Sequence, residues 1–253
     1  MNVLITGANG FVGKNLRVRL GELNGYSILA YTKNQSLIEL EQLVNASDFI
    51  FHLAGINRPQ HPDEFVHGNS ELTEQLCELV SKSGRDIPIM ISSSTQAELD
   101  NLYGLSKRAA EEALLKLKRE QGNTVYIYRL PNVFGKWSRA NYNSAVATFC
   151  HNIAHDLPIT INDPLAKLNL VYIDDVVAEF VDILTLGGDN ADVYQHVAPV
   201  YQTTVGDLAD IIESFKDSIV SGITPRVGTG LVRALYSTYL SFLPLAKFSY
   251  PLV

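Results

Sequence analysis

The chain has 253 residues, of which 46% are hydrophobic, and it carries a formal net charge of −7 at neutral pH. It can bury a large core, which favours one domain with an appended lobe over two independent domains. The acidic balance gives no reason to expect nucleic acid or an anionic membrane as a partner, because both select basic faces. Cys77 and Cys150 lie far apart without metal-ligand spacing. We therefore expect buried thiols, no metal site, and a cytoplasmic protein without an export signal or membrane span.

The first elements are a strand, a glycine turn and a helix. Asn2–Thr6 is an apolar run typical of a buried strand, and a helical pattern starts at Phe11. Between them, Gly7 allows a sharp turn, Gly10 lets bare backbone approach a pyrophosphate, and Gly13 lets the helix lie close to the strand. The free N–H groups of the helix then face the phosphates. Glycines also mark ordinary turns, but this placement predicts a dinucleotide site.

A second strand is predicted over Tyr26–Thr32, and its end is where this kind of site contacts the adenosine ribose. An acidic residue there binds the ribose hydroxyl of NAD, whereas a cation accommodates the additional phosphate of NADP. Lys33 stands at this position, so we expect NADPH with Lys33 as the phosphate contact. The alternative is that Lys33 is a solvated loop lysine.

The next strand is predicted over Asp48–Gly55, and its small final residues leave room for a cofactor above the strand tip. A helical pattern then runs from near Asn69 to Val80. Asn69 has two interpretations, since it can orient backbone at the site or cap that helix. Capping is the better guess from a single sequence.

Hydroxyl and lysine side chains follow the strand predicted over Ile87–Ile91. Ser92, Ser93, Ser94 and Thr95 come directly after it, and they are expected at the carboxyl edge of a parallel sheet. Tyr103 and Lys107 open a long helix and lie one turn apart on one face. That spacing lets the ammonium stabilise a phenolate and lower the pKa of the tyrosine, which is typical of proton exchange near neutral pH.

The motifs resemble those of the extended short-chain dehydrogenase/reductases that act on nucleotide sugars. The resemblance implies a Rossmann-like doubly wound parallel sheet in residues 1–160 and a smaller, interleaved substrate-binding lobe in residues 161–253. Further elements are predicted as a helix over Asn141–Ala154, a strand over Leu168–Ile173, an aspartate-capped helix over Asp174–Leu186 and a helix over Thr204–Phe215. The matching segments are Thr6–Gly13, His52–Gly55, Ser92–Ser94, Tyr103–Lys107 and Arg129–Gly135.

The resemblance also implies roles for individual residues. Ser94 matches the serine that bonds the reacting oxygen, Tyr103 the proton donor or acceptor, and Lys107 the lysine that also holds the nicotinamide ribose. Asn132 matches an asparagine beside the sugar-nucleotide diphosphate; otherwise it is a loop residue. Many relatives carry an arginine where this chain has Leu168, so Lys136, Arg139, Lys167 and Arg226 are candidate diphosphate contacts. The implied cofactor-binding set is Gly7, Asn9, Gly10, Phe11, Val12, Gly13, Lys33, Leu53, Ala54, Gly55, Ser92, Tyr103 and Lys107.

A closer similarity is to bifunctional bacterial enzymes of capsular polysaccharide synthesis in the UDP-N-acetyl-L-fucosamine pathway. It implies NADPH-dependent reduction of the C4 ketone of a UDP-2-acetamido-2,6-dideoxy-L-hexos-4-ulose, giving UDP-N-acetyl-6-deoxy-L-talosamine. Those enzymes carry a C-terminal cupin epimerase domain that this sequence lacks, and family members usually form homodimers. The segments that match are Asn123–Arg129, Phe134–Trp137, Asn141–Ser144, Ala147–Cys150 and Leu235–Pro244.

Three other functions are alternatives to this reduction. A dehydratase of this family has an acidic pair after the strand-end threonine, where this chain has Gln96 and Ala97. A UDP-sugar 4-epimerase would retain its NAD(P) and show no net consumption of cofactor. A catalytically silent dinucleotide-binding sensor or scaffold is free to lose Ser94, Tyr103 or Lys107, all of which are present.

Overall fold

The computed structural model describes residues 1–59, 61, 65–187, 192–221, 223 and 227–248. The chain divides into two compact units, and each is described by itself. Unit 1 is Met1–Leu130 with Val176–Val197, and unit 2 is Pro131–Asp175 with Ala198–Val253. The chain thus passes between the units after residues 130, 175 and 197, whereas the predicted division is at residue 160. In the sequence, the first segment of unit 2 lies between two strands of the sheet of unit 1. The sheet of unit 1 is therefore built from two separate stretches of the chain.

Unit 1 contains a six-stranded sheet in the order β2-β1-β3-β4-β5-β8, with every neighbouring pair parallel. This arrangement confirms the predicted parallel α/β sheet. The pairing of β4 with β5 is the longest, running from Ile89 opposite Val125 to Ser94 opposite Leu130. The strands are β1 (Asn2–Thr6), β2 (Ser27–Tyr31), β3 (Phe49–His52), β4 (Ile89–Ser94), β5 (Val125–Leu130) and β8 (Tyr194–Gln195).

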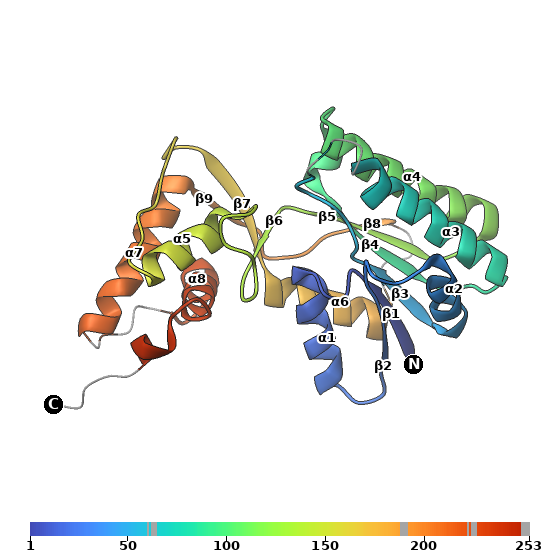
Figure 1. Cartoon of the computed structure of the whole chain (residues 1–253), viewed down its shortest axis with the longest axis horizontal. Helices are drawn as coiled ribbons and strands as arrows, with labels where there is room; N and C mark the ends of the chain where they lie inside the picture. The colour runs from blue at the N-terminus through green and yellow to red at the C-terminus, as the bar shows by residue number, and fades with distance from the viewer. Residues whose placement is uncertain (60, 62–64, 188–191, 222, 224–226, 249–253) are drawn as a thin grey trace. The chain divides into compact units, whose positions relative to one another are not determined.

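Helices cover both faces of this sheet (Figure 1). On one face, Leu4, Ile50 and Ile89 pack with buried residues of α2, α3 and α4. On the other face, Phe180 of α6 packs on Phe51 with ring centroids 5.9 Å apart. Because both faces are buried, the strands read as nearly continuous apolar runs. The helices are α1 (Phe11–Glu22), α2 (Leu37–Ala46), α3 (Leu72–Ser83), α4 (Leu102–Gln121) and α6 (Ile173–Leu186), with a π-helical turn η1 (Val66–Glu71) before α3 and a 3-10 turn η2 (Thr95–Glu98) before α4.

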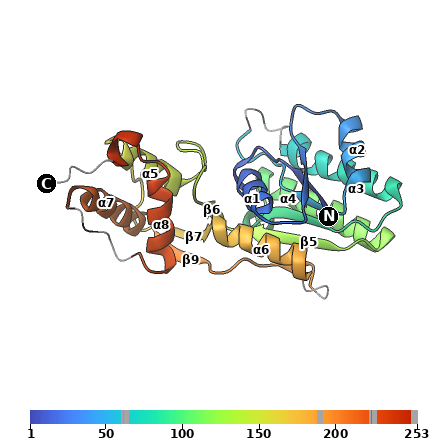
Figure 2. The ribbon, with the colours of Figure 1, turned by 90° about the horizontal axis from the view of Figure 1, so that it is seen from below.

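Unit 2 is built on a smaller, three-stranded sheet in the order β6-β7-β9, in which only β7 and β9 are antiparallel. Phe134, Phe149, Phe215 and Tyr239 lie in its buried core. Figure 2 shows α5, α7 and α8 lying together beside one another. The elements are β6 (Asn132–Phe134), α5 (Ala145–Ala154), β7 (Lys167–Tyr172), β9 (Tyr201–Thr204), α7 (Val205–Ser221), α8 (Gly230–Leu240) and a 3-10 turn at Leu245–Phe248.

Two predicted helix starts are corrected in this region of the chain. Helix α5 begins at Ala145 rather than Asn141, because the Ser144 hydroxyl caps it by accepting a hydrogen bond from Ala147 N at 3.2 Å. Asp174 lies inside the first turn of α6 rather than at its cap. Among the described residues, we find no helix that combines the length and the apolar character needed to cross a bilayer.

Candidate active site

The glycine turn after β1 is held by close backbone packing. Gly7 has φ +67°, and a Cβ there would lie 2.7 Å from Ala54 N beyond the end of β3. A Cβ on Gly13 would overlap the carbonyl oxygen of Gly7. Gly10 N donates to that same oxygen at 2.8 Å. Gly7 and Gly13 are therefore needed for the turn itself to form, before any ligand is considered.

The turn presents the open end of α1. Gly10 is the N-cap and offers no side chain, and the first α-helical bond runs from Lys14 N to Gly10 O at 2.9 Å. The backbone N–H groups of Phe11, Val12 and Gly13 come before that bond, so no carbonyl of an earlier helical turn accepts a hydrogen bond from them. Together with the helix dipole, they can bind an anionic group.

Two cations occur near the end of β2, and sequence reasoning found only one. Lys33 is exposed, as expected for a residue that could meet a ligand. Arg17 of α1 reaches back to the turn, where its Nη1 donates to Asn9 Oδ1 at 3.0 Å and to Ala8 O at 3.5 Å. Ala8 N in turn donates to Tyr31 O, the last residue of β2, at 3.4 Å. The sequence signal that could have identified Arg17 is a cation in the second turn of the helix that follows the glycines.

A directional chain of hydrogen bonds fixes the end of β3. Ala54 N donates to Thr6 Oγ1 at 3.2 Å, and the Thr6 hydroxyl lies 2.8 Å from Nδ1 of His52. On the other side, His52 Nε2 lies 2.8 Å from Thr73 Oγ1, which donates to Asn69 O at 2.6 Å. Because the Thr73 hydroxyl donates to Asn69 O, it accepts from His52 Nε2, which therefore carries a proton. Burial favours the neutral ring, because it lowers the pKa of His52 to about 3.

Asn69 does not cap a helix, which corrects the sequence-based guess. It lies inside η1, and its side chain bonds both Ile56 N and Ile56 O, at 2.9 and 3.0 Å, and Ser106 Oγ at 2.9 Å. It therefore joins the loop after β3 to α4. A Cβ on Gly55 would lie 2.9 Å from Asn69 Oδ1 and 3.0 Å from Lys107 Nζ, so the loop passes too close for a larger residue.

Ser94, Tyr103 and Lys107 come together at the end of β4. The Ser94 hydroxyl interacts with the Tyr103 phenol, and Lys107 Nζ donates to Ser92 O at 3.1 Å. Burial raises the pKa of Tyr103, and the interaction with Ser94 opposes that rise. Burial also lowers the pKa of Lys107 to about 8. The expectation that Lys107 lowers the pKa of Tyr103 is wrong for this structure, because Lys107 Nζ lies 6.0 Å from the ring centroid and burial dominates.

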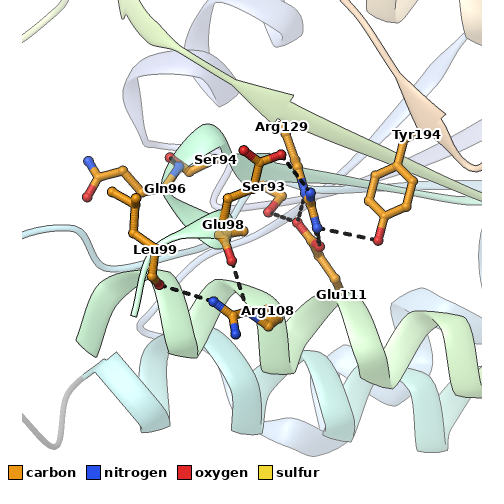
Figure 3. A network of polar contacts seen from close by, with 10 residues as sticks. Ser93, Ser94, Gln96, Glu98, Leu99, Arg108, Glu111, Arg129 and Tyr194 are labelled. Atoms are coloured by element: carbon orange, nitrogen blue, oxygen red, sulfur yellow. Dashed lines mark hydrogen bonds and ion pairs between the residues drawn. The ribbon is translucent and has the colours of Figure 1, made fainter. Parts of the chain in front are cut away.

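The serines belong to β4 itself rather than to a loop beyond it, which corrects the predicted strand end. Successive residues of a strand face opposite sides, so the Ser93 side chain lies on the other side of β4 from those of Ser92 and Ser94. Ser93 is buried and its hydroxyl donates to Glu111 of α4, which is also bound by Arg129 (Figure 3). Sequence reasoning missed Glu111, although it lies one helical turn after Lys107.

The remaining predicted residues lie in unit 2. Asn132 begins β6 and is exposed. Lys136 pairs with Asp174, and the Arg139 guanidinium lies 5.1 Å from the ring centroid of Tyr142. Lys167 is exposed, and Arg226 lies outside the described residues. In the described part of the chain, no group of three or more side chains has the arrangement of a metal site.

Known proteins resemble this chain in sequence and in fold. The chain is 58% identical over 250 residues to a UDP-2-acetamido-2,6-beta-L-arabino-hexul-4-ose reductase of Pseudomonas aeruginosa, covering 99% of the chain and 67% of that protein. The capsular polysaccharide assembling protein CapF of Staphylococcus aureus superposes with a TM-score of 0.91 at 42% identity, covering 100% of the chain and 69% of that protein.

A more distant structure, a UDP-glucuronic acid 4-epimerase from Bacillus cereus in complex with NAD, has a TM-score of 0.81 at 18% identity over 96% of the chain and 98% of that protein. That likeness concerns the fold alone. The family model for NAD-dependent epimerases and dehydratases matches residues 3–195, which include the glycine turn and the Ser94, Tyr103 and Lys107 group. The chain therefore belongs to the NAD-dependent epimerase/dehydratase family.

Proposed function

We propose that the chain is an NADPH-dependent reductase of the C4 ketone of a UDP-2-acetamido-2,6-dideoxy-L-hexos-4-ulose, with UDP-N-acetyl-6-deoxy-L-talosamine as product. One observation carries the chemistry: a phenol, a hydroxyl and a buried ammonium meet at the end of β4. The substrate is inferred from the 58% identity to the P. aeruginosa reductase. The chain spans about two thirds of that relative and of CapF, and the proposal concerns the reduction alone.

The residues present fit a dinucleotide. The open amides of Phe11, Val12 and Gly13 suit its pyrophosphate, and Ala54 and Gly55 leave the loop after β3 free of large side chains. When bound, the reduced nicotinamide supplies a hydride for the ketone carbon. The chain's own residues must hold that cofactor, orient the ketone and deliver a proton.

Tyr103 is the proton donor in this proposal. Its pKa is raised by burial, so the group remains a phenol at neutral pH and carries a proton to give. Ser94, which interacts with the same phenol, binds the ketone oxygen in this proposal as negative charge develops on it. Lys107 keeps a buried positive charge near that oxygen, anchored by Ser92 O at 3.1 Å. Proton transfer from a positioned group contributes about 10²–10⁴-fold to such a rate.

The preference for NADPH rests on the cations at the end of β2. Lys33 is exposed there, and Arg17 is held at the glycine turn by Asn9 Oδ1 at 3.0 Å. The Arg17 guanidinium and the Lys33 ammonium can each bind the phosphate that NADPH carries on its adenosine ribose, and NADH lacks this phosphate. Arg19, an exposed arginine of the same helix that pairs with Glu22 at 3.1 Å, provides the matched control.

The test is the stoichiometry of cofactor consumption. The purified chain is mixed with NADPH and the 4-keto sugar nucleotide, and NADPH absorbance is followed together with the product by mass spectrometry. We expect one NADPH oxidised per alcohol formed. Interconversion of sugar epimers without net oxidation would identify a 4-epimerase. Normal NADPH binding with no turnover of the ketone would favour the silent dinucleotide-binding protein.

A further inference from the structure

Glu111 is a buried carboxylate that the proposed reaction does not use. Its side chain is 1% exposed, and it lies on the face of α4 that packs against the sheet. Arg129 of β5 binds it through two nitrogens, with Nε 3.0 Å from Oε1 and Nη2 2.6 Å from Oε2. Ser93 of β4 donates its hydroxyl to the same group. Figure 3 shows the carboxylate lying between the two strands and the helix.

The arginine of this pair is shared with more exposed partners. Arg129 Nη1 lies 3.2 Å from Glu98 Oε1, and its guanidinium stacks 4.5 Å from the ring centroid of Tyr194. The Arg129 side chain is 26% exposed, and that of Glu98 is 70% exposed. Buried ion pairs are often no more stabilising than apolar residues of the same size, because desolvation offsets their attraction. Stability alone therefore gives no reason for a charge at position 111.

The location of Glu111 relates it to the site. It lies one helical turn after Lys107, so the two side chains are neighbours on one face of α4. Its partner Ser93 lies between Ser92, whose carbonyl accepts from Lys107, and Ser94, which lowers the pKa of Tyr103. The carboxylate thus touches both the strand end that carries the serines and the helix that carries the lysine.

We propose that Glu111 is a positioning residue of this site, which fixes the end of β4 through Ser93 and Arg129 and places a negative charge one turn from the Lys107 ammonium. The inference rests on the proposed reductase function for its kinetic consequence. Its electrostatic part concerns the chain without any ligand and can be measured separately.

Among the described residues, few charged groups face Lys107, so the contribution of Glu111 is separable. From β3 comes His52, which is neutral, and from η1 the amide of Asn69. From α4 come the Tyr103 phenol and Glu111, and from β5 the guanidinium of Arg129, which contacts Glu111. Burial lowers the pKa of Lys107, and Glu111 raises it. Removal of the carboxylate charge should lower that pKa by about 1 pH unit.

The deciding experiment compares Glu111→Gln with Glu112→Gln, the same change at the next, exposed position of α4. Lysine labelled with ¹³C at Cε is titrated by NMR in the unliganded chain, with the Lys107 signal assigned from its loss in Lys107→Arg. We expect the Lys107 midpoint to move down by about 1 pH unit in Glu111→Gln alone. The alkaline limb of kcat/KM should move with it, and kcat should fall about tenfold or more as the strand end loosens.

An unmoved Lys107 midpoint in a folded Glu111→Gln chain, or an equal movement in Glu112→Gln, overturns the inference. If Glu111→Gln does not fold, Glu111→Asp decides, because it keeps the charge and withdraws it by one methylene. Its expected result is a near-normal Lys107 midpoint with a lowered kcat, and an unchanged kcat overturns the positioning role. Should no ketone be reduced by the wild-type chain, the proposed function fails while the titration still tests Glu111.

Discussion

Replacing Lys107 by methionine should make unit 1 more stable while it inactivates the site. Lys107 is only 6% exposed, and its pKa falls from 10.5 to about 8. That fall corresponds to a cost of about 3 kcal/mol for keeping the side chain charged in the folded chain at neutral pH. Methionine removes this cost but loses the bond to Ser92 O, worth about 1 kcal/mol. We therefore expect a net gain of about 2 kcal/mol in the free energy of unfolding.

The pH dependence gives the sign of the effect. Because the folded-state pKa is below the unfolded value of 10.5, the unfolded chain binds more protons between these values. The penalty is thus complete below about pH 8 and disappears above 10.5. Urea unfolding of wild type, Lys107→Met and the exposed control Lys116→Met, followed by circular dichroism, should show the advantage of Lys107→Met at neutral pH only. A Lys107→Met chain less stable than wild type at neutral pH would refute the reasoning.

The remaining predictions concern the proton donor, the glycine turn and the cofactor. Tyr103→Phe should lower kcat about 10²–10⁴-fold with NADPH binding unchanged, measured by stopped-flow absorbance and fluorescence titration; near-normal turnover would remove Tyr103 from the mechanism. Gly13→Ala, whose Cβ would overlap the turn, should abolish dinucleotide binding. The control Gly21→Ala lies in the same helix, and its Cβ meets nothing within 4 Å. Thermal unfolding should show that this control raises the free energy of unfolding by about 0.5–1 kcal/mol. Arg17→Gln combined with Lys33→Gln should weaken binding of NADPH but not NADH in parallel fluorescence titrations, and equal weakening of both would contradict a phosphate-binding role.

Local signals were enough to predict the sheet and the glycine turn. The glycines of the turn lie within thirteen positions of the N-terminus, and Gly13 packs on Gly7 and Ala8, its neighbours in the chain. By contrast, Asn69 could be placed only once the loop after β3 and α4 were both known, because its partners Ile56 and Ser106 lie on either side of it in sequence. A single asparagine before a helical pattern looks like a cap. In the structure η1 begins earlier, so the residue lies inside a helix.

Two other features depended on tertiary pairing. Residues 131–175 leave unit 1 and the chain returns to the same sheet, which no periodicity along the sequence reveals. The serine run was expected beyond the end of its strand, but β4 continues through Ser94, so alternation places the Ser93 side chain on the opposite side from those of Ser92 and Ser94. Glu111 was missed for a related reason. A glutamate in a charged helix usually lies at the surface, and its burial follows from the position of Arg129 opposite Ser93 in the sheet.

The N-terminal half of α4 carries three groups of the proposed site on one rigid element. Tyr103, Lys107 and Glu111 follow each other at four-residue spacing, so each lies one turn above the last. The start of this helix is fixed by Asn101, whose Oδ1 accepts from Gly104 N at 2.8 Å, and by Gly104, where a Cβ would overlap Gln96 O. The phenol, the ammonium and the carboxylate therefore keep their spacing only if the helix stays against η2 and β4. The polar contacts at this junction hold groups whose burial is unfavourable for folding in the arrangement that the proposed proton transfer to a ketone requires.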